Sequence, residues 1–416
     1  MDRSGRGGED AGTRPGTAPG GTRSAGGPEP AGRGSALREA PLGPLTLRNR
    51  ILKAATFEGV TPHGVVTPEL VAFHERVARG GAALSTVAYL AVSPEGRTDR
   101  HCVLLGDDTI AGLRRVTDAV HAAGAAAAAQ IGHAGPVANG RSNRAAVLAP
   151  SGGFTPVGSR TRGASDADIA RITEAFGRGA SVARKAGFDA VEVHLGHNYL
   201  LSAFLSPHLN RRTDRWGGSL DRRARFPLQV VREVRNAVGP RLAVTVKLNM
   251  ADGVPGGFWL DESVEFARML EGDGAVDAIT LTGGSSLANP MFLFRGEVPR
   301  REFAATLPVP LRLGFRAFGG RFLREYPFEE AFFLPYARQF LDALDVPLVL
   351  LGGINRLDTV EAAIGEGFSF VAMARALLRQ PDLVNRFLQG AVDEGLCVHC
   401  NRCMPTIYRG TRCVLA

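Results

Sequence analysis

Eight short apolar segments alternate with longer segments that carry helix-start signals, and this alternation constrains the fold more than any other feature of the sequence. Strands of a parallel sheet are buried on both faces, read as near-continuous apolar runs, and are joined by helices. Helix starts are marked by Thr67-Pro68-Glu69 and by Ser165-Asp166-Ala167-Asp168. The pattern predicts strands at 50–56, 82–88, 125–131, 191–193, 242–248, 277–281, 347–351 and 368–373. Eight such units predict an α/β protein closed into a (β/α)8 TIM barrel.

The two ends of the chain differ in composition from this pattern. Residues 1–36 contain no Leu, Ile, Val, Phe, Tyr or Trp. Such a segment cannot bury enough apolar surface to offset chain entropy, so we expect a disordered tail, with a mis-set start codon as the alternative. The predicted division is a tail at 1–36, a barrel domain at 37–390 and a Cys-rich extension at 391–416.

One connection, residues 285–333 after the sixth strand, is far longer than the usual barrel loop. It holds seven arginines and ten aromatic residues: Phe292, Phe294, Phe303, Phe315, Phe318, Phe322, Tyr326, Phe328, Phe332 and Phe333. The segment is interpreted as a subdomain packed on the barrel. Two alternatives are a lid over the catalytic face and a basic-aromatic element touching a membrane.

Charge and composition exclude few partners but favour a small-molecule enzyme. Lys and Arg total 49 against 41 Asp and Glu, for a net charge of +8, and no lysine-rich block is present, so nucleic-acid binding is not favoured. No apolar run reaches the roughly 18 residues that span a bilayer, and the N-terminus lacks the apolar core of a signal peptide. Four of the five cysteines crowd at the C-terminus, unlike a secreted disulfide framework. The expectation is a cytoplasmic protein with a small-molecule substrate, and homo-oligomerisation stays open.

Two imidazoles and a phenol cluster where the fourth strand ends, at His194, His197 and Tyr199. Imidazoles donate hydrogen bonds and a phenol can give up a proton, so the cluster suits general acid chemistry. A single histidine in such a place is more often a hydrogen-bonded core residue. Three together favour a catalytic site.

The stretch HLGHNYLLSAFLSPHLNRRTDRWGGSLDRRARF resembles the Old Yellow Enzyme family of FMN-dependent NADH:flavin oxidoreductases. In that family a His-x-x-His or His-x-x-Asn precedes a tyrosine, a Phe-Leu-Ser-Pro segment and an Arg-x-Asp-x-x-Gly-Gly-Ser loop. The resemblance covers roughly residues 41–385. It implies FMN at the C-terminal mouth of the barrel, NADH or NADPH as reductant, and ping-pong, ene-reductase-like reduction of electron-poor C=C bonds. His194 and His197 would bind the substrate carbonyl and Tyr199 would protonate the α-carbon.

Further residues are expected to hold the cofactor. The loops after strands 7 and 8 often bind phosphate in TIM barrels, which points to Gly353, Ala374 and Arg375. By resemblance, Gln130 bonds the flavin pyrimidine ring and Lys247 lies near flavin N1. A lysine within an apolar strand needs a partner, which supports that role. The remaining expected flavin-lining residues come from the first two strands: Ala54, Ala55, Thr56 and Ala88.

The C-terminal extension contains C-x2-C-x2-C-x9-C, formed by Cys397, Cys400, Cys403 and Cys413, a donor set that suits an iron–sulfur cluster or zinc. His399 is a potential substitute ligand, and a metal-free remnant is the alternative. The spacing is similar to that of cluster-bearing relatives such as trimethylamine dehydrogenase and 2,4-dienoyl-CoA reductase. Two further alternatives therefore stay open: an iron–sulfur flavoprotein of that type, and a non-catalytic flavin-binding protein attached to a membrane or partner through the 285–333 insert.

Overall fold

The computed structural model describes residues 34–416 apart from 156–157, 308, 310–311, 313–314, 316–318, 321 and 408. Eight parallel strands close into one barrel, and all eight predicted strands are confirmed, with boundaries shifted by at most three residues. In chain order around the barrel they are β3 (Ile51–Lys53), β4 (Leu84–Ala91), β5 (Ala126–Gly132), β9 (Ala190–Leu195), β10 (Ala243–Asn249), β11 (Ala278–Thr282), β12 (Leu348–Leu351) and β13 (Phe370–Met373).

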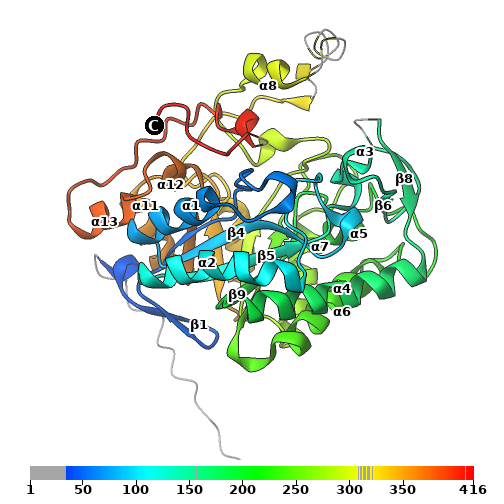
Figure 1. Cartoon of the computed structure of the whole chain (residues 1–416), viewed down its shortest axis with the longest axis horizontal. Helices are drawn as coiled ribbons and strands as arrows, with labels where there is room; N and C mark the ends of the chain where they lie inside the picture. Colours follow the sequence, from blue (N-terminus) through cyan, green and yellow to red (C-terminus); the bar gives the residue numbers. More distant parts are fainter. Residues whose placement is uncertain are drawn as a thin grey trace, which may run out of the picture.

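Helices form the outer layer of the barrel (Figure 1). Both predicted helix starts are confirmed: Leu70 N donates to Thr67 Oγ1, and Ser165 and Asp168 form a reciprocal capping box. The helices are α1 (Pro68–Arg79), α2 (Ile110–Ala122), α3 (Gly140–Asn143), α4 (Asp166–Lys185), α5 (Leu200–Leu205), α6 (Leu220–Val238), α7 (Leu260–Gly272), α8 (Arg300–Thr306), α10 (Leu334–Leu341), α11 (Leu357–Glu366), α12 (Arg375–Arg379) and α13 (Leu383–Leu388).

A short hairpin, β1 (Ala40–Leu42) and β2 (Leu45–Leu47), closes the N-terminal end of the barrel (Figure 1). Leu42 and Leu47 are buried in one cluster with small and branched residues from the barrel strands. The described chain begins before the predicted boundary at residue 37: Ala36 is fully buried, and Ser35 Oγ donates to Glu361 Oε2 at 2.8 Å. Residues 1–33 of the expected tail lie outside the described residues.

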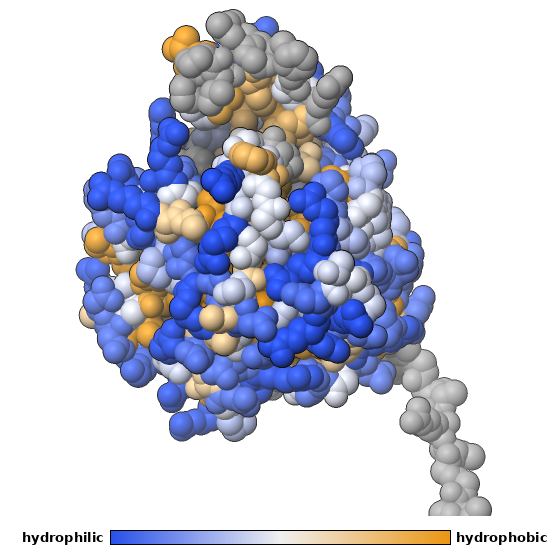
Figure 2. Space-filling model, turned by 90° about the vertical axis from the view of Figure 1, so that its right-hand side faces the viewer, coloured by the Kyte–Doolittle hydropathy of each residue, from blue (hydrophilic) through white to orange (hydrophobic). Residues whose placement is uncertain are grey.

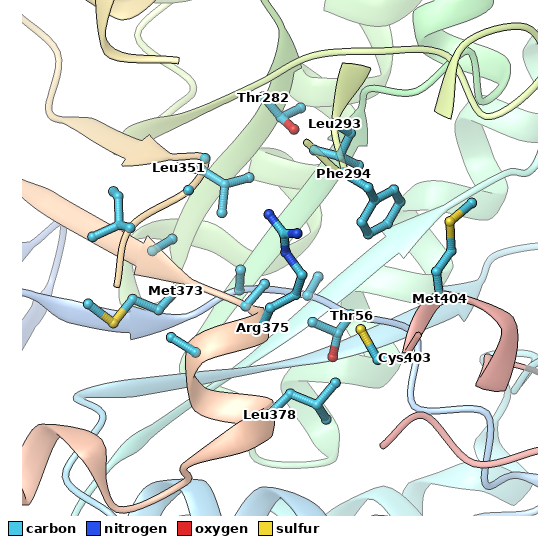
Figure 3. Close-up of a pocket in the computed structure, with 18 of the residues that line it drawn as sticks. Thr56, Thr282, Leu293, Phe294, Leu351, Met373, Arg375, Leu378, Cys403 and Met404 are labelled. Carbon is cyan, nitrogen blue, oxygen red and sulfur yellow. The ribbon is translucent and has the colours of Figure 1, made fainter. Parts of the chain in front are cut away.

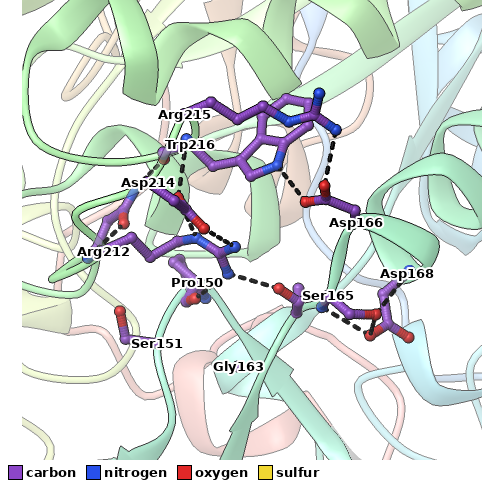
Figure 4. A network of polar contacts seen from close by, with 12 residues as sticks. Pro150, Ser151, Gly163, Ser165, Asp166, Asp168, Arg212, Asp214, Arg215 and Trp216 are labelled. Carbon is purple, nitrogen blue, oxygen red and sulfur yellow. Dashed lines mark hydrogen bonds and ion pairs between the residues drawn. The ribbon is translucent and has the colours of Figure 1, made fainter.

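A second small sheet stands beside the mouth of the barrel and is braced by ion pairs (Figure 4). It consists of β6 (Val147–Ala149), β7 (Gly153–Phe154) and β8 (Arg160–Gly163). Arg212 pairs with Asp214 and donates to the Pro150 and Ala164 carbonyls, while Trp216 Nε1 donates to Asp166 at 2.6 Å. These contacts join the loop after α5 to the small sheet and to the start of α4.

The 285–333 insert and the Cys-rich extension pack against each other over the C-terminal ends of the strands (Figure 1). Asn401 Nδ2 donates to the carbonyls of Phe294 and Glu297, at 2.5 and 3.0 Å. The ring of His399 stacks on Phe328 with a centroid distance of 3.3 Å. The described parts of the two segments therefore form one roof over the ends of the strands.

The surface gives no direct support to the membrane interpretation of the insert. Within the part of the chain that the structure describes, no helix is long and apolar enough to cross a membrane. The face in Figure 2 is largely hydrophilic. None of the described aromatic residues of the insert is an exposed side chain, and Phe292, Phe332 and Phe333 are buried.

Candidate functional site

A cavity of about 920 Å³, including its open mouth, lies under this roof at the C-terminal ends of the strands (Figure 3). Seven of the nine predicted cofactor residues line it: Ala54, Ala55, Thr56, Lys247, Gly353, Ala374 and Arg375. Ala88 and Gln130 do not line this cavity. Ala88 is tied by its backbone N–H to Glu58 at 3.0 Å, and Gln130 turns its amide toward a neighbouring strand.

Two glycines let aromatic rings pack closely against the backbone where β12 ends. Gly352 and Gly353 have φ angles of 121° and 73°, which favour glycine. A Cβ at Gly353 would meet the Phe332 ring at 2.4 Å, and one at Gly352 would meet Phe333 at 2.5 Å. The loop thus brings bare backbone to the cavity under two aromatic rings, as a phosphate cradle requires.

Arg375 extends into the centre of the cavity (Figure 3). Its Nη1 donates to the Arg295 carbonyl at 2.9 Å and to Asn401 Oδ1 at 2.5 Å. No carboxylate pairs with Arg375 among the described residues, and burial lowers the pKa of its guanidinium. A buried cation without an acidic partner fits an anionic ligand such as the phosphate of FMN.

The barrel interior below the cavity carries two buried ion pairs. Lys247 Nζ lies 3.4 Å from Glu192 Oε1, which also accepts a 2.7 Å hydrogen bond from Gln130 Nε2. Lys53 pairs with Glu58 at 3.0 Å and donates to Thr56 Oγ1 at 2.8 Å. Burial alone would raise the pKa of Glu58, but Lys53 and His74 outweigh it and hold the pKa at about 2. Each lysine below the cavity is therefore paired with a carboxylate.

The predicted catalytic side chains meet at the end of β9. The rings of His194 and His197 lie 5.1 Å apart between centroids, and the Tyr199 ring meets His194 edge-on at 4.6 Å. His197 lines the cavity, whereas His194 and Tyr199 stand beside it. His194 Nδ1 is buried without a hydrogen-bond partner among the described residues, which is unusual for a polar atom in a protein interior.

His197 is held in place through its backbone and its ring. It has a φ of 60°, and its N–H donates to Asn249 Oδ1 at 3.1 Å. Asn249 Nδ2 donates to Asp252 Oδ1 and to the Gly284 carbonyl, so the amide orientation is fixed. The ring Nε2 of His197 lies 3.0 Å from Thr282 Oγ1.

Both histidines are neutral near pH 7. Burial, and then the charge of Lys247, lowers the pKa of His197 to about 3, and burial also holds the pKa of His194 well below its usual value of 6.5. Each ring therefore donates from one nitrogen only, and the pair contributes hydrogen bonds without adding positive charge.

This burial predicts an acid-sensitive fold. An unfolded histidine takes up a proton near its ordinary pKa of 6.5, while folded His197 stays neutral down to a pKa of about 3, so stability is lost as pH falls between these values. In flavin-free protein, the free energy of unfolding of His197→Asn should depend less steeply on pH than that of the wild type. Between about pH 6 and 4 its slope should be smaller by up to about 1.4 kcal/mol per pH unit. Urea titrations at several pH values measure this slope, and an unchanged slope contradicts the assignment.

The four C-terminal cysteines line one smaller cavity, which Arg375 also borders. Cys403 lies in the wall between the two cavities because it lines both. The donors suit a thiolate-ligated metal. However, within the described residues no group of three or more His, Cys, Asp or Glu is arranged to hold a metal ion. The sulfurs would have to draw together on loading, so the metal site stays a prediction.

Several site residues carried no clear signal in the sequence. Lys53 sits in the apolar first strand, and the same reasoning that singled out Lys247 could have found it. The C-terminal lining residues Met404, Ile407 and Thr411 lie in the spacer between Cys403 and Cys413, where the sequence shows no further motif. Cys102, the cysteine outside the C-terminal motif, is buried.

Comparisons with known proteins agree with this geometry. Residues 40–281 match the NADH:flavin oxidoreductase / NADH oxidase family. The chain is 59% identical over 382 residues to the 4,4'-dithiodibutanoate disulfide reductase of Rhodococcus erythropolis, covering 92% of this chain and 95% of the relative. It is 34% identical to the metal reductase of Desulforamulus reducens, covering 89% of this chain and 51% of the relative. This chain thus spans about half the length of several curated relatives.

Solved structures share the fold. A 2-naphthoyl-CoA reductase complex superposes with a TM-score of 0.75 at 23% identity, covering 86% of this chain and 52% of that one. Morphinone reductase in complex with tetrahydroNAD superposes with a TM-score of 0.67 at 24% identity, covering 87% of this chain and 92% of that one. At these identities the likeness establishes the barrel architecture.

Proposed function

The chain belongs to the NADH:flavin oxidoreductase / NADH oxidase family, and from this premise we propose that it passes electrons from NAD(P)H through FMN to an electron-poor C=C bond. The observation that carries the proposal is the cluster of His194, His197 and Tyr199 beside a cavity fitted for a phosphate-bearing cofactor. FMN, when bound, would supply the hydride chemistry that links the nicotinamide to the acceptor.

The side chains divide the remaining work. The neutral rings of His194 and His197 donate to the carbonyl oxygen conjugated with the alkene and stabilise the negative charge that develops there. Tyr199 gives a proton to the α-carbon. Lys247 presents a positive charge at the cavity floor, where it favours the reduced cofactor. The roof excludes water from these groups.

An organic disulfide is a second candidate acceptor, favoured by the relative named 4,4'-dithiodibutanoate disulfide reductase, which is 59% identical over nearly all of both chains. The reaction balances as NAD(P)H + H⁺ + RSSR giving NAD(P)⁺ + 2 RSH. Hydride would reduce one sulfur, the S–S bond would break, and Tyr199 would protonate the leaving thiolate.

Anaerobic turnover assays with FMN-loaded protein distinguish the candidates. NADH and NADPH are each tested with 2-cyclohexenone and with 4,4'-dithiodibutanoate. Enone reduction that falls at least about tenfold in kcat/KM in His194→Ala supports the first proposal. Turnover of the disulfide alone makes the second candidate the function. Flavin that binds but passes electrons to neither acceptor leaves a non-catalytic flavin-binding protein or an amine dehydrogenase, which amine donors would reveal.

We also propose that Cys397, Cys400, Cys403 and Cys413 form one metal site, with an iron–sulfur cluster favoured over zinc. Anaerobically purified protein should contain about four irons and matching sulfide per chain, and Cys400→Ser should lose them. About one zinc per chain would instead indicate a structural clip whose affinity is coupled to folding. Neither metal, with full activity retained in Cys400→Ser, refutes the metal site and leaves the flavin proposal intact.

A further inference from the structure

Glu192 lies at the centre of a buried polar group inside the barrel. It is 6% exposed on β9, and the residues opposite it on the two flanking strands are Gln130 on β5 and Thr245 on β10, with Lys247 two residues further along β10. Its Oε1 accepts from Gln130 Nε2 at 2.7 Å and lies 3.4 Å from Lys247 Nζ. One carboxylate oxygen therefore contacts both of the groups that the family resemblance assigns to the flavin pyrimidine edge.

The carboxylate determines which way the Gln130 amide points. An ionised carboxylate only accepts hydrogen bonds, so it takes the amide N–H of Gln130. The hydrogen bond thus fixes Gln130 Nε2 on the side of Glu192 and turns Oε1 away from that carboxylate. Without Glu192, the amide would lose its fixed orientation and could present either atom.

The same carboxylate offsets the charge of Lys247. Lys247 is 2% exposed and borders both the cofactor cavity and a smaller cavity beneath it, which Glu192 also lines. Glu192 is the carboxylate that pairs with Lys247 among the described residues. How much positive potential reaches the cofactor cavity thus depends on Glu192.

We propose that Glu192 is a positioning residue that orients Gln130 and offsets Lys247, and thereby sets the redox potential of the bound flavin. The inference rests on the proposed FMN-dependent function. Glu192→Gln removes the negative charge and leaves Lys247 uncompensated, so the site should favour the reduced, anionic flavin. The affinity for reduced FMN, divided by the affinity for oxidised FMN, should rise at least about tenfold. This change raises the two-electron reduction potential of the bound flavin by about 30 mV.

Reductive titration of the FMN-loaded protein against a reference dye measures this ratio. Glu192→Asp keeps the charge but shortens the side chain, so it should stay within about threefold of wild type even where FMN binds less tightly. Lys247→Met should shift the potential downward.

Equal weakening of both redox states in Glu192→Gln, with an unchanged ratio, would overturn the proposal and leave Glu192 a packing residue. A shift in Glu192→Asp as large as in Glu192→Gln would overturn it as well, since charge would then not be the cause. The proposed function fails by a different result: wild-type protein that binds no FMN, or whose FMN is not reduced by NAD(P)H.

Discussion

Tyr199→Phe should slow reduction of the acceptor by about 10²–10⁴-fold while reduction of bound FMN by NAD(P)H continues at the wild-type rate. The two half-reactions differ because hydride transfer from the nicotinamide needs no protein acid, whereas the acceptor needs a proton. The phenylalanine ring keeps the edge-on contact with His194, so geometry is preserved while the acid is lost. Anaerobic stopped flow, with each half-reaction followed in flavin absorbance, measures both rates.

Tyr89 supplies a matched control for this experiment. Its ring packs against Tyr199 at 5.4 Å, but its hydroxyl already donates to the Gly96 carbonyl at 2.6 Å. Burial also holds the pKa of the Tyr89 hydroxyl well above its usual value, so the group keeps its proton. Tyr89→Phe should therefore leave acceptor reduction within about threefold of wild type. Equal losses in both variants would mean that Tyr199 supports packing and is not the acid.

Arg375→Met should weaken FMN binding by about 10- to 100-fold, because a hydrogen bond to a charged group contributes about 1.5–3 kcal/mol. The side chain stands in the cavity and has no acidic partner among the described residues, so the phosphate is its expected counter-charge. Riboflavin lacks the phosphate and its affinity should change little. Flavin fluorescence titration of both ligands gives the ratio of their affinities.

Arg386→Met is the control for the loss of an arginine. Arg386 pairs with Asp382 on the outer surface and does not line the cavity. Its replacement should leave both affinities unchanged. If Arg375→Met weakens FMN and riboflavin equally, Arg375 holds the roof through Asn401 and does not bind the phosphate.

The sequence alone determined the barrel and the order of its strands. Apolar strand runs and helix caps are local signals, so Thr67 and Ser165 marked their helices correctly. Residues at strand ends of a parallel barrel meet at one face by topology, so His194, His197 and Tyr199 could be placed together before any contact was known. Gly353, Ala374 and Arg375 followed from the same rule, whereas Lys247 was assigned through the family resemblance.

Only the tertiary structure decided which strand-end side chains reach the cavity and what covers it. The family resemblance assigns Gln130 to the flavin, and only the structure shows that Glu192, 62 residues away, takes its amide N–H. Asn401 joins the Cys-rich extension to an insert more than a hundred residues earlier, and so brings Cys403 into the cavity wall. Ser35 and Ala36 are ordered through Glu361. Such pairings leave no local period or cap in the sequence, because hydrogen bonds between distant segments form only after the barrel has brought them together.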